Sequence, residues 1–186
     1  MKENSAQLAN PFQEPTCNHI LYCYEKLDCY IENLVSFILS GVEQGSFIVL
    51  IENERIFQLI DKKLYSLLSK EQKKLINYVN NFDFYFSHGD FHTPTIISTF
   101  SNLIEPYRKG GATIGTWAHV EWGNHDEIAG KIKEFEVVAN QTVYSMNTTS
   151  VCAYDADRLS ESLKKDLNSS HPYQLTDTDF LIMATK

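Results

Sequence analysis

A continuous apolar run, Ser46-Phe47-Ile48-Val49-Leu50-Ile51, constrains the fold of this chain more than any other feature of its sequence. The run has the length of a strand and lacks polar alternation, which is typical of a strand buried on both faces of a parallel sheet. Apolar residues recur at helical spacing before it, from Leu27 to Ile38, and after it, from Ile56 to Leu68. Helices on both sides of a buried strand predict an α/β fold.

The same alternation continues along the chain. We expect further strands at 82–87, 112–120, 150–154 and 180–183, and helices that begin near Ser69, Thr93, Asn124 and Asp157. Ser69 with Gln72 predicts a capping box for a helix that runs to Val79. This order of elements predicts three layers, a mostly parallel β-sheet flanked by helices. The sequence predicts a flexible leader at 1–16 and a single domain over 17–186.

Charge and cysteine content exclude several classes of protein. A net charge of -8 argues against nucleic-acid binding, which requires clustered Lys and Arg. No segment approaches the roughly 18 apolar residues of a membrane span, and the polar start of the chain is no signal peptide, so we expect a cytoplasmic protein. Cys17, Cys23 and Cys29 do not share a helix face, and no C-x-x-C pair occurs. We therefore expect reduced thiols, no cofactor and no bound metal.

The turn after the apolar run lacks the features of a phosphate-binding loop. Such a loop is rich in glycine and ends in Lys-Ser/Thr, so that backbone N–H groups and the lysine surround the phosphates. Here the turn is Glu52-Asn53-Glu54-Arg55-Ile56-Phe57. It contains no glycine, and its two glutamates would repel a polyphosphate. We therefore expect no ATP hydrolysis at this turn.

Several short motifs occur in an order that resembles one known family. They are His19-Ile20-Leu21-Tyr22, Phe37-x-x-x-Gly41-x-x-x-Gly45, Glu121-Trp122, Phe135-Glu136-x-x-x-Asn140, Cys152-x-Tyr154-Asp155 and His171-Pro172. In this order they resemble the MEDS domain, the sensory domain of methanogen and methylotroph regulators, including the dichloromethane-responsive repressor. The resemblance implies a RecA/KaiC-like P-loop fold with a degenerate phosphate loop, and a small organic or hydrocarbon-derived ligand. One departure is that the family often has an Arg before the Glu-x-Trp segment, where this chain offers His119 or nothing.

The resemblance and the positions near strand ends together give the candidate ligand-binding residues. They are His19, Tyr22, Glu121, Trp122, Glu136, Cys152, Tyr154 and His171. Structural roles remain open for most of them. The alternative role of His19 is that of a surface or capping residue. The alternative for Trp122 is a core or rim aromatic, and for Glu136 a solvated helix residue. Cys152 and His171 are also explained as structural, and Asp155 as a helix cap.

His88, Asp90 and His92 form an H-x-D-x-H run that could bind a metal from one side of a strand. Gly89 and Thr93-Pro94 indicate a loop there instead, and His119 or His125 could complete a site only if that loop folds across. No nucleophile elbow or Ser/His/Asp set is recognisable.

The leading hypothesis for function is a non-enzymatic sensory or regulatory domain. It would bind a small organic ligand and signal through a protein partner or through self-association, since no DNA-binding or kinase segment is recognisable in the chain. A second hypothesis is a protein-interaction module whose ancestral pocket has closed. A third is a metal-dependent enzyme that uses His88, Asp90 and His92.

Overall fold

The computed structural model describes residues 19–123 and 125–183, with the side chains of 125–127 excepted, so the expected leader at 1–16 lies outside the described residues. A single sheet runs in the order β3-β2-β4-β5-β1-β6-β7, and its pairs are parallel except for antiparallel β6–β7. The mostly parallel α/β sheet that the sequence predicts is therefore confirmed. The strands are β1 (His19–Tyr24), β2 (Phe47–Glu52), β3 (Ile76–Asn80), β4 (Ile114–His119), β5 (Thr149–Asp155), β6 (Tyr173–Leu175) and β7 (Phe180–Ile182).

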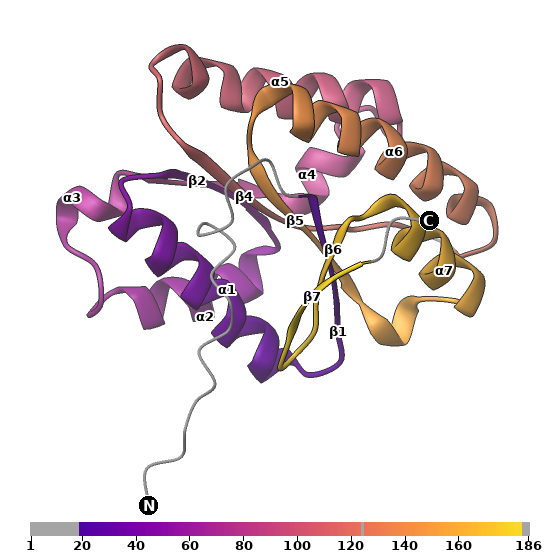
Figure 1. Cartoon of the computed structure of the whole chain (residues 1–186), viewed down its shortest axis with the longest axis horizontal. Helices are drawn as coiled ribbons and strands as arrows, with labels where there is room; N and C mark the ends of the chain where they lie inside the picture. The colour runs from indigo at the N-terminus through magenta and orange to yellow at the C-terminus, as the bar shows by residue number, and fades with distance from the viewer. Residues whose placement is uncertain (1–18, 124, 184–186) are drawn as a thin grey trace, which may run out of the picture.

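Helices cover both faces of the sheet, as Figure 1 shows. They are α1 (Leu27–Glu43), α2 (Glu54–Leu64), α3 (Lys70–Lys73), α4 (Asn81–Phe86), α5 (Thr93–Lys109), α6 (His125–Met146) and α7 (Glu161–Ser170), with a 3-10 turn η1 (Ala156–Arg158) before α7. One apolar core lies between the sheet and α1 and α2. The other lies between the sheet and α4, α5, α6 and α7. Successive side chains along each central strand therefore enter different cores.

β1 is a central strand that the sequence analysis did not recognise. It lies between β5 and β6, and its side chains are almost completely buried. Among the described residues, the first strand of the sheet is thus His19–Tyr24, and the turn that follows it is Glu25-Lys26. The expected position of the phosphate loop at Glu52–Phe57 is wrong, because that turn follows the second strand. There Asn53 caps α2 by accepting a hydrogen bond from Ile56 N at 2.9 Å.

The segment around residue 80 also differs from expectation. The predicted capping box of Ser69 and Gln72 is confirmed, but α3 ends at Lys73 and the chain then forms β3 instead of continuing as a helix to Val79. The predicted strand 82–87 is helix α4. Asn80 accepts a hydrogen bond from Asp83 N at 3.2 Å, which caps α4. The predicted cap at Asn124 lies outside the described residues.

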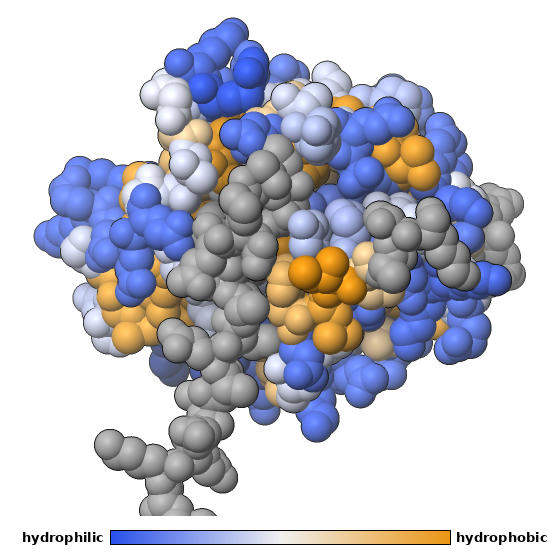
Figure 2. Space-filling view, viewed as in Figure 1, coloured by the Kyte–Doolittle hydropathy of each residue, from blue (hydrophilic) through white to orange (hydrophobic). Residues whose placement is uncertain are grey.

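The C-terminal elements contain two further differences. Ser160 caps α7, whereas the sequence predicted Asp157 for that role, and Asp155 caps η1 instead. Strand β6 was not expected, and the last predicted strand corresponds to β7 at the sheet edge. Leu181 and Ile182 of β7 are exposed, and Figure 2 shows a hydrophobic patch over this strand. Within the described part of the chain, no helix combines the length and apolarity needed to cross a membrane.

Candidate functional site

A buried polar cluster lies on the sheet face that α6 and α7 cover. His19 begins β1, Cys152 and Tyr154 alternate along β5, and His171 follows α7. The pleat of β1 and β5 directs these strand side chains toward α6. Helix α6 contributes Glu136, which is 0% exposed because it lies beside the apolar residues that pack this helix on the sheet. The structure thus brings together five of the expected ligand-binding residues.

Glu136 is the centre of the cluster. Its Oε2 atom lies 3.3 Å from His19 Nε2 and 3.3 Å from His171 Nε2. Tyr154 donates its hydroxyl hydrogen to Glu136 Oε1. His19 Nε2 is also 3.3 Å from Cys152 Sγ, and the two imidazole rings are 4.0 Å apart. Five polar side chains from β1, β5, α6 and the segment after α7 therefore converge on a buried space, where each requires a partner.

Burial and the neighbouring charges set the protonation of this cluster. Burial, reinforced by His171, lowers the pKa of His19. Burial alone would raise the pKa of Glu136, but the charges and hydrogen bonds of His171 and His19 hold that pKa well below its usual range. Burial raises the pKa of the Cys152 thiol and of the Tyr154 hydroxyl well above their usual values. Glu136 is therefore an ionised acceptor, and Tyr154 stays a donor to it.

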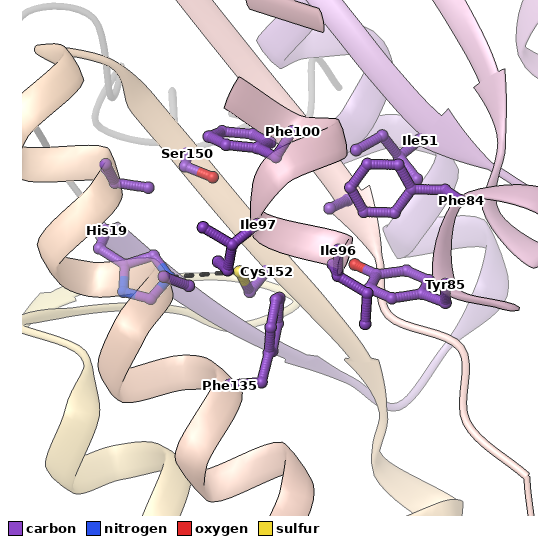
Figure 3. A pocket seen from close by; sticks show the side chains of 13 residues that line it. His19, Ile51, Phe84, Tyr85, Ile96, Ile97, Phe100, Phe135, Ser150 and Cys152 are labelled. Carbon is purple, nitrogen blue, oxygen red and sulfur yellow. Dashed lines mark hydrogen bonds between the residues drawn. The ribbon is translucent and has the colours of Figure 1, made fainter. Parts of the chain in front are cut away.

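An apolar cavity adjoins the cluster, as Figure 3 shows. Its volume is about 20 Å³, and His19 and Cys152 are the members of the cluster that line it. The other walls come from α4, α5, α6 and the sheet and are almost all apolar; they include Tyr85, Ile97, Phe100, Phe135 and Ala139. A space of this size holds about one water-sized molecule. The cavity has an apolar body and one polar end.

The turn between β1 and α1 occupies the position that a phosphate loop takes in a nucleotide-binding relative of this fold. It is Glu25-Lys26, without glycine, and its backbone N–H groups already have an acceptor. The Asp177 carboxylate, from the β6–β7 turn, lies 3.4 Å from Glu25 N and 3.1 Å from Lys26 N. Tyr22 donates to the same carboxylate at 2.9 Å. Asp177 therefore binds the backbone groups that a phosphate would need.

Tyr22 lies apart from the cluster, although the sequence analysis grouped the two. It packs among Tyr24, Tyr30 and Trp117 on the other face of the sheet. Its hydroxyl accepts a hydrogen bond from Asn33 Nδ2 at 3.0 Å in addition to the bond it donates to Asp177. Tyr22 thus supports the β1–α1 turn.

Glu121 and Trp122 follow β4 at the carboxyl edge of the sheet. Arg158 covers both: its Nη1 atom is 2.8 Å from Glu121 Oε1, and its guanidinium lies 4.2 Å from the centre of the Trp122 ring. Trp122 is buried and its ring centre is 5.6 Å from that of Tyr154. Trp122 is therefore a neighbour of the cluster, whereas Glu121 is an ion-pair partner of Arg158.

A second buried network was not anticipated from the sequence. His119 Nδ1 lies 2.7 Å from Glu52 Oε1, and its Nε2 lies 3.1 Å from the Tyr24 hydroxyl. Tyr30 donates to Glu52 Oε2 and accepts from Trp117 Nε1 at 2.9 Å. His119 is thus engaged on both nitrogens. A glutamate directly after an apolar strand was the signal that could have predicted this network.

The H-x-D-x-H run lies in the loop that precedes α5. His88 and His92 stack with ring centres 4.9 Å apart, His92 Nδ1 contacts Thr95 Oγ1 at 2.8 Å, and Asp90 pairs with Lys131 at 3.4 Å. Within the described residues, the side chains placed to hold a metal are His19, Glu136, Cys152 and His171, and the H-x-D-x-H run is not among them. The side chain of His125 is outside the described part.

The fold is similar to that of several solved ATPase-like structures. The KaiC-like protein PH0186 from Pyrococcus horikoshii OT3 matches with a TM-score of 0.57 and 15% identity, over 87% of this chain and 71% of that one. A second solved structure, described as an ATPase domain, matches with a TM-score of 0.57 and 11% identity, over 91% and 75%. The flagellar accessory protein FlaH from Methanocaldococcus jannaschii matches with a TM-score of 0.51 and 11% identity, over 87% and 71%. The chain therefore has a KaiC-like α/β fold.

The match to a family model identifies this chain more specifically than the similarity of its fold does. The family description "MEthanogen/methylotroph, DcmR Sensory domain" (MEDS) matches residues 18–172, so this chain belongs to the MEDS family of sensory domains. No curated protein matches it significantly. The resemblance drawn from the sequence motifs is thereby confirmed.

Proposed function

We propose that this sensory domain binds a small molecule in the cavity beside the buried cluster and has no nucleotide-hydrolysing activity. The observation that carries the proposal is the junction of an apolar cavity with His19 and Cys152 of a fully buried polar cluster. Convergent polar groups at one end of an apolar pocket are typical of ligand sites. Membership in a sensory family supports the same assignment.

The β1–α1 turn is not suited to bind the phosphates of a nucleotide. The β1–α1 turn has no glycine, and the Asp177 carboxylate already binds its N–H groups. A negative carboxylate at this point also repels a polyphosphate. On the neighbouring strands, Glu52 and His119 satisfy each other.

The cavity restricts the class of ligand. A volume of about 20 Å³ admits a molecule of very few non-hydrogen atoms, or a larger one only if a wall moves. Helix α5 is the wall best suited to move, since most of its residues are partly or fully exposed. The ligand we propose has an apolar body and one polar or soft atom, the latter directed at His19 and Cys152. Displacement of α5 would then present the ligand-bound state to a protein partner or a second copy of the chain.

Saturation-transfer NMR with methanol, methanethiol and dichloromethane tests this proposal. We expect at least one of these compounds to receive saturation from the protein, and Ile97→Phe to abolish the transfer by filling the cavity. Leu103→Phe introduces the same side chain elsewhere on α5, at a residue that does not line the cavity, so it should leave the transfer intact. Transfer that is equally strong in both variants would place the binding elsewhere and contradict the proposal.

The small size of the cavity also favours a second candidate, a protein-interaction module with a closed pocket. It predicts that none of the three compounds binds and that Ile97→Phe raises the melting temperature by filling empty space without affecting any ligand. The same experiment therefore separates the two candidates.

A further inference from the structure

Four different metal-binding side chains meet in the buried cluster. His19 Nε2, His171 Nε2, Cys152 Sγ and one Glu136 oxygen all lie within 4.8 Å of one another, and all four residues are buried. They come from β1, the segment after α7, β5 and α6, so the fold brings them together from distant parts of the sequence. Imidazole nitrogen, thiolate sulfur and carboxylate oxygen are the ligands that Zn²⁺ uses in proteins.

The hydrogen bonding of His171 leaves a lone pair directed into this space. Its Nδ1 lies 2.8 Å from the Leu167 carbonyl oxygen, which only accepts, so Nδ1 is the nitrogen that carries the hydrogen. In the neutral ring, Nε2 is then an acceptor, and it faces another acceptor, Glu136 Oε2, at 3.3 Å. Within the described chain neither atom completes a hydrogen bond of good geometry. Two acceptors that face each other in a dry interior require a proton or a cation between them.

A divalent cation contacts all four side chains at once, whereas a proton on one imidazole pairs only that ring with Glu136. Protonating both imidazoles would place two positive rings 4.0 Å apart inside the protein, against the single carboxylate of Glu136. Burying unbalanced charge is costly. A Zn²⁺ ion with two neutral histidines, the Glu136 carboxylate and the Cys152 thiolate has no net charge. Binding would release the thiol proton to solvent.

Three of the spacings between the donor atoms also fit a tetrahedral ion. Ligand atoms about 2.0–2.3 Å from Zn²⁺ at the corners of a tetrahedron lie about 3.3–3.8 Å apart. His19 Nε2 is 3.3 Å from Cys152 Sγ and 3.3 Å from Glu136 Oε2, and His171 Nε2 is 3.3 Å from that same oxygen. We propose that His19, Glu136, Cys152 and His171 bind one Zn²⁺ ion.

The surroundings support two of the four proposed ligands, His171 and Glu136. Metal-bound histidines usually donate their other N–H to a carbonyl or carboxylate, and metal-bound carboxylates accept further hydrogen bonds. His171 has the Leu167 carbonyl, and Glu136 has the Tyr154 hydroxyl. The ion would lie at the polar end of the cavity, so this inference deepens the proposed function and rests on the same cluster. The evidence for the metal site is independent of the evidence for the ligand, because it depends on the four donor atoms and not on the cavity.

The test begins with the metal content of the full chain as purified. We expect about one equivalent of zinc, released on denaturation. After chelation, titration with Co²⁺ should produce the absorption of a tetrahedral ion together with a thiolate-to-cobalt charge-transfer band. Cys152→Ser should abolish that band, whereas Cys23→Ser, the same change at a cysteine outside the cluster, should leave it unchanged. Tyr154→Phe should weaken Zn²⁺ binding by about 10–100-fold.

A folded chain with no bound metal and no Co²⁺ spectrum would overturn the inference. So would a charge-transfer band that disappears in Cys23→Ser and persists in Cys152→Ser. If Cys152→Ser does not fold, the stoichiometry and Co²⁺ spectrum of the unmodified chain decide the question. Saturation transfer to the small probes is measured separately on metal-free protein, so binding there without metal would sustain the proposed function while the metal inference fails.

Discussion

At the residue scale, what the sequence could predict depended on whether a residue's element was recognised. Glu136 is buried, as expected for a carboxylate that lies beside an apolar helical stripe and needs a partner. Tyr22 was grouped with His19 because both belong to one motif. Had 19–24 been recognised as a strand, the period of two would have placed Tyr22 and His19 on opposite faces, as the structure does. The motif showed that Tyr22 and His19 are close in the sequence, but it did not show which face of the sheet each side chain occupies.

Removing the Tyr154 hydroxyl should destabilise the protein more than an ordinary Tyr→Phe change. The hydroxyl is the donor to the buried Glu136 Oε1, and loss of a hydrogen bond to a buried charge costs about 1.5–3 kcal/mol. Urea unfolding of Tyr154→Phe should therefore show a loss of about 2 kcal/mol. Tyr144→Phe, at a hydroxyl on the exposed part of α6, should change the free energy of unfolding by less than about 0.5 kcal/mol. Equal effects in the two variants would mean that Glu136 does not depend on Tyr154.

Asp177 should stabilise the turn that follows β1. Asp177→Ala removes the acceptor of Glu25 N, Lys26 N and the Tyr22 hydroxyl, which should cost about 1–3 kcal/mol in a denaturation experiment. Asp179→Ala is the matched control, because Asp179 lies in the same turn and its carboxylate accepts from the exposed Thr178 side chain. A larger loss in Asp179→Ala than in Asp177→Ala would contradict the role given to Asp177.

At the scale of elements, long periodic segments were predicted well and short ones were not. Helices α1, α5 and α6 follow from apolar periodicity, and strands β2, β4 and β5 correspond to apolar segments of strand length. The segment 82–87 was predicted as a strand, and the aromatic residues it contains favour strands. The Asn80 cap turns it into a helix, in which Phe82 and Phe86 stack at 5.0 Å, one helical turn apart. Strand β1 was not predicted, because its histidine, cysteine and tyrosines interrupt the run of aliphatic residues by which a buried strand is recognised.

Two glycines should respond in opposite directions to alanine. Gly130 lies in the interior of α6 with open space around its added Cβ, so Gly130→Ala should stabilise the protein by about 0.5–1 kcal/mol. Gly45, in the turn after α1, has a φ of +75°, so Gly45→Ala should destabilise by about 1–2 kcal/mol although its Cβ also meets open space. Melting temperatures of the two variants check this. A fall for Gly130→Ala would show that α6 does not continue through this residue.

At the scale of the whole molecule, the fold class followed from the sequence and the location of the candidate site did not. Ligands of open α/β sheets usually bind beyond the carboxyl ends of the strands, which is where the sequence analysis expected them. In this protein Arg158 covers Trp122 at that edge, and Asp177 fills the β1–α1 turn. The polar cluster lies instead between the sheet and helices α6 and α7. Only contacts between distant segments could have shown this, because they determine which motif residues meet.

The central claim is that recognition takes place beside the buried cluster and not at the β1–α1 turn. Amide NMR spectra of the labelled chain, recorded with Mg²⁺-ATP and with each of the three small probes, test it most directly. We predict that at least one probe shifts the amide signals of Ile97, Phe100 and Phe135, which line the cavity. We also predict that Mg²⁺-ATP leaves the signals of Glu25, Lys26 and Asp177 unchanged. Shifts at the β1–α1 turn with Mg²⁺-ATP, and none at the cavity with any probe, would contradict the account.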